Sequence, residues 1–159
     1  LGPLLWQLPP TKKFEPDDFG AFLDLLPARA GDVALRHAVE LRHPSFVCEE
    51  VVAACRTRGV AIVLAADSDY PMIADQTADF SYLRIMGTTE GQPKGYPPAA
   101  LDTWADRARA LAGGQQPDDL PGIAAPARSG ARDVFLFVIS GHKAANPAAA
   151  MALIERTQA

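Results

Sequence analysis

The stretch VELRHPS, residues 39–45, places charged and polar side chains at the end of an apolar strand. Glu40, Arg42 and His43 follow one another closely, and Pro44 then ends the strand pattern because proline has no N–H to give to a sheet. Successive strand residues point to opposite faces, so Glu40 and Arg42 share one face. Polar groups at a strand end are typical of a ligand site at the carboxyl edge of a parallel sheet.

Strand-like and helix-like patterns alternate along the rest of the chain. Strands are predicted over residues 4–8, 36–41, 60–66, 80–86 and 134–139. Helices are predicted to begin at Pro16, near Ser45 and at Asn146, and another covers residues 101–111. This alternation predicts an α/β fold in which parallel strands are joined by right-handed crossovers.

The faces of these strands favour a barrel over an open sheet. Central strands of an open sheet are covered on both sides and are apolar throughout. Here bulky apolar residues alternate with small or polar ones, as in barrels, where bulky residues point outward to the helices. The predicted inward set is Leu5, Gln7, Ala38, Glu40, Arg42, Ala61, Ala65, Asp67, Tyr82, Arg84 and Met86.

A complete (β/α)8 barrel has eight strands and about 250 residues. The five predicted strands therefore correspond to strands four to eight of a TIM-type barrel, with the first three units absent, and the start at Leu1 is expected to reflect truncation or processing. We predict a single domain over residues 1–159, with a flexible insertion at residues 113–131, which are rich in glycine and proline.

Composition narrows the class of protein. Of the 159 residues, 48% are hydrophobic and 21% charged, the balance of a soluble globular domain. The net charge of −4 argues against nucleic-acid binding through bulk positive charge, without excluding a local basic cluster. No apolar run approaches the roughly 20 residues that span a bilayer, and no secretory signal is visible, so a cytoplasmic protein without membrane association is expected. Cys48 and Cys55 share a helical face with Val51 and Val52 and are interpreted as core residues.

The candidate site residues suggest anion recognition. Arg42 and Arg84 are predicted to reach the mouth of the barrel, at the carboxyl ends of its strands. Two guanidinium groups there suit a carboxylate or a phosphate. Glu40 or Asp67 is then a candidate general base, and His43, which begins the adjoining loop, is a further candidate catalytic residue. The alternatives are structural: Glu40 and Arg42 as a buried ion pair, and His43 as a hydrogen-bonded loop residue. No Walker, dinucleotide-binding or serine-hydrolase motif occurs, and no cofactor is indicated.

Several segments together resemble a known family. LGPLLWQLPP (1–10), AVELRHPSF (38–46), TADFSYLRIMG (77–87) and NPAAAMALIE (146–155) are similar to segments of the domain-of-unknown-function 72 (YecE-like) family of bacterial proteins. The resemblance implies a (β/α)8 barrel similar in architecture to those of endonuclease IV and xylose isomerase, with no established activity. Positions that match the family pattern are Gln7, Glu40, Arg42, His43, Pro44, Asp67, Tyr82 and Arg84. It adds Gln7 and Tyr82 to the expected ligand-binding residues.

Two departures from that pattern weaken the expectation of catalysis. Met86 stands where the family usually has histidine, and Ile139-Ser140-Gly141 replaces an aromatic-Asn-Asn run. Both changes remove polar groups from the mouth, and no metal site is predicted. Three hypotheses remain open. They are an enzyme acting on an anionic small molecule or phosphoester, a non-catalytic module that binds a ligand or a nucleic-acid end, and an inactive truncated copy.

Overall fold

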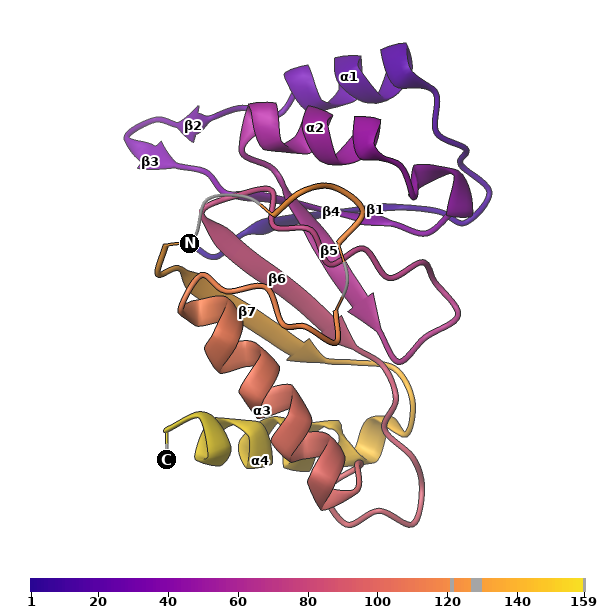
Figure 1. The fold of residues 1–159 in the computed structure, drawn as a ribbon, viewed down its shortest axis with the longest axis vertical. Coiled ribbons are helices and arrows are strands. Elements are labelled where there is room, and N and C mark those ends of the chain that lie inside the picture. The colour runs from indigo at the N-terminus through magenta and orange to yellow at the C-terminus, as the bar shows by residue number, and fades with distance from the viewer. Residues whose placement is uncertain (121, 127–129, 159) are drawn as a thin grey trace.

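A five-stranded parallel sheet forms the centre of the computed structural model, which describes residues 1–120, 122–126 and 130–158 (Figure 1). The strand order is β1-β4-β5-β6-β7 and every neighbouring pair is parallel. The bounds are Leu4–Leu8 for β1, His37–Leu41 for β4, Ala61–Ala66 for β5, Phe80–Ile85 for β6 and Asp133–Val138 for β7. All five predicted strands are confirmed, and so is the α/β class with its parallel sheet.

Within the described residues four α-helices accompany the sheet, and three of them contain a proline near the start. Their bounds are Pro16–Asp24 for α1, Glu49–Arg58 for α2, Pro98–Ala112 for α3 and Asn146–Gln158 for α4. Proline suits the first turn because its missing N–H would have no partner there. The structure adds two short 3-10 helices, η1 (Pro44–Phe46) and η2 (Lys143–Ala145), and a small hairpin of β2 (Arg29–Ala30) and β3 (Val33–Ala34). The sequence did not predict this hairpin.

The predicted start of α2 near Ser45 was wrong. Residues 44–46 form η1, Cys48 is extended with φ −152° and ψ 156°, and α2 begins only at Glu49. The Ser45 hydroxyl does not cap α2, because it accepts from the Phe14 N–H at 2.8 Å and contacts His43 Nδ1 at 2.8 Å. The predicted stop at Gly59 is confirmed by its left-handed φ of 62°, which glycine adopts without strain.

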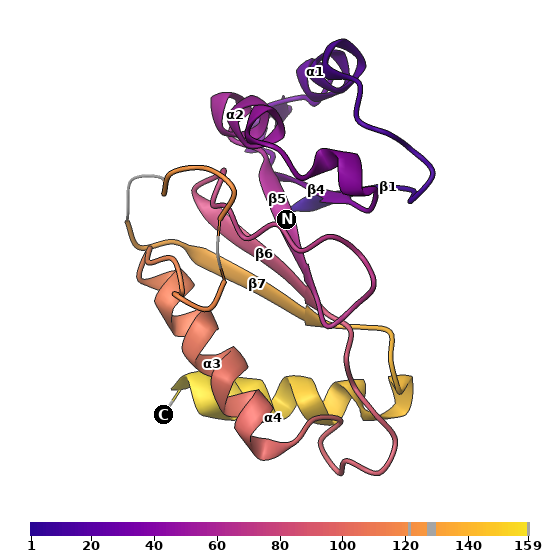
Figure 2. The same cartoon turned by 45° about the vertical axis from the view of Figure 1, so that its right-hand side comes forward.

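The helices cover one face of the sheet in two groups (Figures 1 and 2). Helices α1 and α2 pack on β4 and β5 around Phe46, Val51 and Cys55. Helices α3 and α4 pack on β5, β6 and β7 around Leu101 and Trp104. We call this covered side the convex face, and it carries the bulky outward residues that the sequence predicted.

The opposite face, here called the concave face, is strongly curved. Its central layer is Ala38, Ala61, Val63, Phe80 and Tyr82. Contacts across this face join strands that are not neighbours. Gln7 Oε1 of β1 lies 3.1 Å from Arg84 Nη1 of β6, and Arg36, just before β4, pairs with Asp133 of β7 at 2.6 Å. In a flat sheet, β1 and β6 would lie about 14 Å apart, close to the full reach of the two side chains, so these contacts favour a sheet that curls toward this side.

The connection from β5 to β6 has no helix, unlike a regular β/α unit. Residues 67–79 form an irregular loop there, and part of the predicted flexible insertion packs against it. Leu120 is buried in the core under α3, and Ile123 and Ala124 pack on the core under α2. Residues 121 and 127–129 of that insertion lie outside the described residues.

Asp75 fastens the insertion to the β5–β6 loop. Its carboxylate is fully buried and accepts from the Ile123 N–H at 2.7 Å and the Ala124 N–H at 2.9 Å, with Arg56 Nη2 at 3.6 Å. A buried carboxylate needs such donors because its desolvation is otherwise uncompensated. The described part of the insertion therefore covers the sheet where the missing helix would lie.

Replacing Asp75 by asparagine is expected to lower the free energy of unfolding by about 2–3 kcal/mol, since hydrogen bonds to a buried charge are lost. Asp119→Asn is the matched control, because its exposed pair with Arg107 is worth less than about 1 kcal/mol. Urea unfolding followed by circular dichroism measures both. Equal losses in the two variants would contradict the anchoring role of Asp75.

The two cysteines, both free, are expected to differ in reactivity. Burial raises the pKa of the Cys55 thiol to about 12, whereas Cys48 is half-buried at the start of α2. Because the thiolate is the reactive form, a disulfide reagent at pH 8 should modify Cys48 quickly and Cys55 only after unfolding. Cys48→Ser should leave a single slow thiol, and a fast thiol in that variant would show that Cys55 is not buried.

Candidate functional site

Four side chains meet on the concave face near the carboxyl ends of the strands. Gln7, Glu40, Arg42 and Arg84, together called the Glu40 cluster, come from β1, β4 and β6 and from the residue after β4. Arg42 Nε donates to Glu40 Oε1 at 2.6 Å, and Arg84 Nη1 donates to Glu40 Oε2. Gln7 Oε1 accepts from Arg42 Nη2 at 2.8 Å and from Arg84 Nη1 at 3.1 Å. Every member was predicted as a site residue.

The register of the sheet explains why these residues meet. Gln7 pairs with Glu40 in register, so the two side chains stand next to each other on one face. Between β4 and β6 lies β5, which contributes Ala61, Val63 and Ala65 to this face, and Ala65 is the partner of Arg84. Since alanine is small, the Arg84 side chain crosses β5 and reaches Glu40.

The cluster carries an excess positive charge. The Glu40 side chain is fully buried, while those of Arg42 and Arg84 each keep 16% of their surface exposed. Two guanidinium groups on one carboxylate leave a net charge of +1, and Gln7 adds none. Arg42 also lies over the Tyr70 ring, 4.2 Å from its centroid, which holds the guanidinium by a cation–π contact. The sequence did not single out Tyr70.

Tyr82 lies on the same face, two residues before Arg84 on β6. Its ring stacks on Phe137 of β7, with centroids 5.0 Å apart and an interplanar angle of 25°. Burial raises the pKa of the Tyr82 hydroxyl. Tyr82 therefore presents a neutral phenol at the edge of the cluster, in the position where the sequence predicted a ligand-binding residue.

His43 is linked to the loop after β1 through Ser45. Its Nδ1 atom accepts from the Ser45 N–H at 3.1 Å and lies 2.8 Å from the Ser45 hydroxyl, which in turn accepts from the Phe14 N–H. An accepting Nδ1 assigns the proton of the neutral ring to Nε2. These bonds join the end of β4 to the chain before α1, which is the structural role considered for His43 alongside the catalytic one.

Asp67 is not brought into the Glu40 cluster. It follows β5 with a left-handed φ of 54°, and Asp67 Oδ2 accepts from the Tyr96 hydroxyl and from Trp104 Nε1, each at 3.0 Å. Both donors belong to the core under α3, so this carboxylate faces the convex side. The alternation of strand residues predicted the concave side. It failed because the left-handed backbone at Asp67 ends the alternation.

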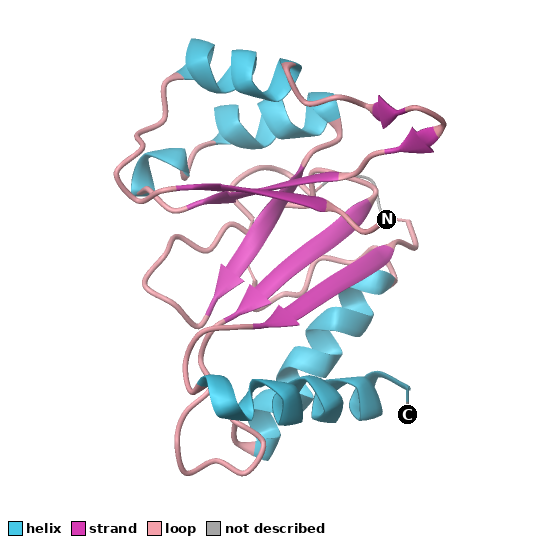
Figure 3. Ribbon diagram, turned by 180° about the vertical axis from the view of Figure 1, so that it is seen from behind, coloured by secondary structure: helices cyan, strands magenta, loops and turns pink. Residues whose placement is uncertain are grey.

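The loops after β6 and β7, which include Met86 and residues 139–141, are joined by hydrogen bonds. The Thr88 hydroxyl donates to Asn146 Oδ1 at 2.6 Å, and His142 N–H donates to the Thr88 carbonyl at 2.8 Å. Ser140 and Gly141 both have positive φ, 58° and 52°, and a Cβ on Gly141 would lie 2.5 Å from the Thr88 oxygen. Met86 is buried at the end of β6. These loops are thus packed together beside the carboxyl ends of β6 and β7 (Figure 3).

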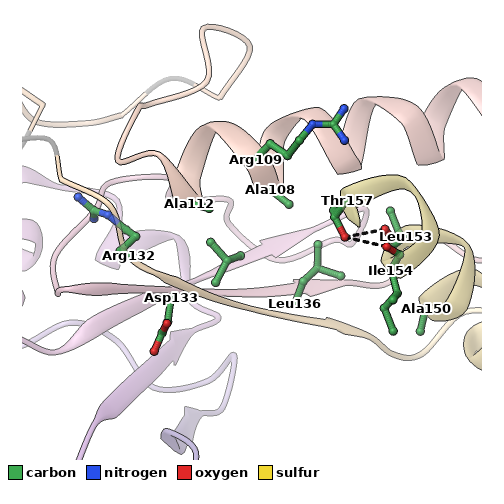
Figure 4. A pocket seen from close by; sticks show the side chains of 11 residues that line it. Ala108, Arg109, Ala112, Arg132, Asp133, Leu136, Ala150, Leu153, Ile154 and Thr157 are labelled. Carbon is green, nitrogen blue, oxygen red and sulfur yellow. Dashed lines mark hydrogen bonds between the residues drawn. The ribbon is translucent and has the colours of Figure 1, made fainter. Parts of the chain in front are cut away.

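A groove of about 450 Å³ lies on the convex side, between α3, α4 and β7 (Figure 4). Small and apolar residues line most of it, including Ala108, Leu136, Leu153 and Ile154, and Asp133 points away from it across the strand. The Thr157 hydroxyl donates to backbone carbonyls of its own helix. Arg109 and Arg132 also line the groove, but both guanidinium groups donate to partners outside it, so the Glu40 cluster is the better candidate for ligand recognition.

Two further features bear on the class of protein. None of the helices in the described residues is long and apolar enough to cross a bilayer. Within the same residues, no three His, Cys, Asp or Glu side chains gather in a way that would hold a metal ion.

Removing the Glu40 carboxylate is expected to destabilise the protein. Glu40→Leu should cost about 3–5 kcal/mol of unfolding free energy, because two partly buried guanidinium groups lose their counter-charge. Adding Arg84→Met should recover part of this loss, since one of the two unpaired charges is then removed. Urea denaturation of the two single variants and the double variant measures the coupling, and simple additivity would contradict a shared ion pair.

The comparisons with known proteins agree with this architecture. The search of curated proteins gave no match. A DUF72 family protein from Thermotoga maritima MSB8 is similar in structure, with a TM-score of 0.63 and 18% identity over 97% of this chain and 55% of that one. A DUF72 family protein from Enterococcus faecalis V583 has a TM-score of 0.63 and 14% identity, over 98% of this chain and 59% of that one. The chain thus spans a little over half the length of either structure. The family model described as "Protein of unknown function DUF72" matches residues 1–159, and the chain therefore belongs to the DUF72 family.

Proposed function

We propose that this chain forms the C-terminal part of a (β/α)8 barrel and binds an anionic small molecule at the carboxyl ends of its strands. The observation that carries the proposal is the pair of guanidinium groups, Arg42 and Arg84, held on one buried carboxylate. Their net positive charge lies at the edge of a parallel sheet where ligands of α/β proteins bind.

Curvature supports the barrel part of the proposal. Two contacts cross the concave face. Gln7 of β1 meets Arg84 of β6, and Arg36, just before β4, meets Asp133 of β7. An eight-stranded barrel has an interior just wide enough for its side chains to fill, which is the scale of curvature that such contacts require. The helices α1 to α4 lie on the convex side, as helices do around a barrel.

The edge of the sheet at β7 also supports continuation of the barrel. Phe137 on its concave side is exposed, and the apolar groove borders its convex side. Side chains of a further strand beside β7 would pack against both surfaces, because neighbouring strands align their faces. The relatives of solved structure are longer than this chain, which is consistent with further strands in the family.

Binding without turnover is the function that the geometry supports best. Both oxygens of Glu40 accept from guanidinium groups, so proton transfer through Glu40 would require these bonds to break. Asp67, the other candidate base, faces Tyr96 and Trp104. A catalytic base must reach the proton that it abstracts, and neither carboxylate is directed toward the free side of the two arginines.

The proposal predicts that the arginines of the cluster, and not arginine in general, bind the anion. Arg42→Met and Arg84→Met should each weaken the binding of acetate or inorganic phosphate about tenfold or more, as expected for a lost charged hydrogen bond. Arg36→Met is the matched control, because it removes an ion pair at the other end of the same face. Calorimetric titration measures the affinities, and thermal melts show whether each variant is folded.

Absence of acetate and phosphate binding to the unaltered protein would contradict the proposal. An equal loss of affinity in Arg36→Met would show that the Glu40 cluster is not the binding site.

A further inference from the structure

The charge of the Glu40 cluster limits the kind of anion that it can hold. Glu40 supplies one negative charge, Arg42 and Arg84 supply two positive charges, and Gln7 accepts two hydrogen bonds without adding charge. The neighbouring Tyr82 is a neutral phenol because burial raises the pKa of its hydroxyl. An anion of one negative charge therefore neutralises the net charge of +1 on the Glu40 cluster.

We propose that the site selects a singly charged oxyanion, a phosphodiester or a carboxylate, over a doubly charged phosphomonoester. This inference rests on the proposed anion-binding function and specifies its ligand. A monoanion brings the cluster to neutrality, whereas a dianion leaves one uncompensated negative charge beside the fully buried Glu40 carboxylate. Attraction to a site of fixed net charge grows in proportion to the charge of the ligand, whereas the cost of removing the ligand from water grows with the square of that charge, so a partly buried site of charge +1 favours the monoanion.

The other two predicted site residues with ionisable side chains, Asp67 and His43, are bonded outside the Glu40 cluster. Asp67 is directed to Tyr96 and Trp104 on the convex side. His43 uses Nδ1 to accept from the Ser45 N–H, and a neutral ring satisfies that bond. Neither residue adds a positive charge that would hold the second charge of a phosphomonoester.

The donors that remain also match a group with two equivalent oxygens. Among the hydrogen bonds of the described residues, none uses Nη1 of Arg42 or Nη2 of Arg84. A carboxylate and a phosphodiester each present two unesterified oxygens, one for each guanidinium. Paired N–H donors of this kind are the usual partners of such oxygens.

Glu40 acts here as a selectivity residue, because it sets the charge that the ligand must supply. Two isosteric substitutions change this charge in opposite directions. Glu40→Gln raises the cluster from +1 to +2, and Gln7→Glu lowers it from +1 to 0. Both replacements keep the length of the side chain and at least one oxygen acceptor for the arginines.

The test compares dimethyl phosphate, a monoanion, with methyl phosphate, which is a dianion at pH 8 because its second pKa is about 6. Calorimetric titration of the unaltered protein should show about tenfold or greater preference for dimethyl phosphate. Glu40→Gln should remove or reverse this preference, and Gln7→Glu should weaken both ligands. Thermal melts report whether each variant is folded.

A second measurement needs no substitution. Lowering the pH from 8 to 5 converts methyl phosphate to a monoanion, so its affinity should rise toward that of dimethyl phosphate. Dimethyl phosphate keeps its single charge over this range and reports any effect of pH on the protein itself. This pH comparison tests the charge selectivity even if Glu40→Gln does not fold.

The outcomes separate this inference from the proposed function. Binding of neither phosphate nor acetate would overturn the anion-binding function itself. Binding of methyl phosphate at pH 8 as tightly as dimethyl phosphate would overturn only the charge selectivity. A preference for dimethyl phosphate that survives in Glu40→Gln would show that Glu40 does not set it.

Discussion

The buried carboxylate of Glu40 is the interaction on which the carboxyl end of the sheet depends. It accepts from Arg42 and from Arg84, and these arginines also converge on Gln7, so four side chains from three regions of the sheet are fixed together. A carboxylate without exposed surface is tolerated only when charged donors compensate its desolvation. The guanidinium groups meet this requirement, and their remaining charge is what makes the cluster a candidate site.

The same cluster depends on curvature, and curvature depends on small residues. Alanine and valine on the concave side of β5 leave space for side chains from β4 and β6 to meet above it. Aromatic side chains of β6 and β7 then fill the concave face below, where Phe80 meets Phe135 and Tyr82 stacks on Phe137. Small residues in the middle and large ones toward one edge thus permit a tighter bend than a uniform sheet would allow.

Much of this arrangement could be predicted from the sequence, because it follows from the alternation of side chains along each strand and from the parallel order of the strands. The alternation of strand residues placed Gln7, Glu40, Arg42 and Arg84 on one face, and the carboxyl ends of parallel strands brought them together. The same reasoning failed at Asp67, where a left-handed residue turns the side chain to the other face. It also missed Asp75 and Tyr70, which lie in a loop without a period, so only tertiary contacts give their roles.

Asp67 and Glu40 show how two carboxylates at neighbouring strand ends acquire different roles. Glu40 lies within the strand, points to the concave face and is bound by two charged donors on both oxygens. Asp67 lies just beyond its strand, and its Oδ2 atom is bound by two neutral donors, a phenol and an indole. A non-glycine residue with positive φ persists only where its surroundings hold it, and here the contacts with Tyr96 and Trp104 do so. Position relative to the strand end, more than residue type, thus separates a carboxylate that organises two arginines from one that joins a strand to a helix.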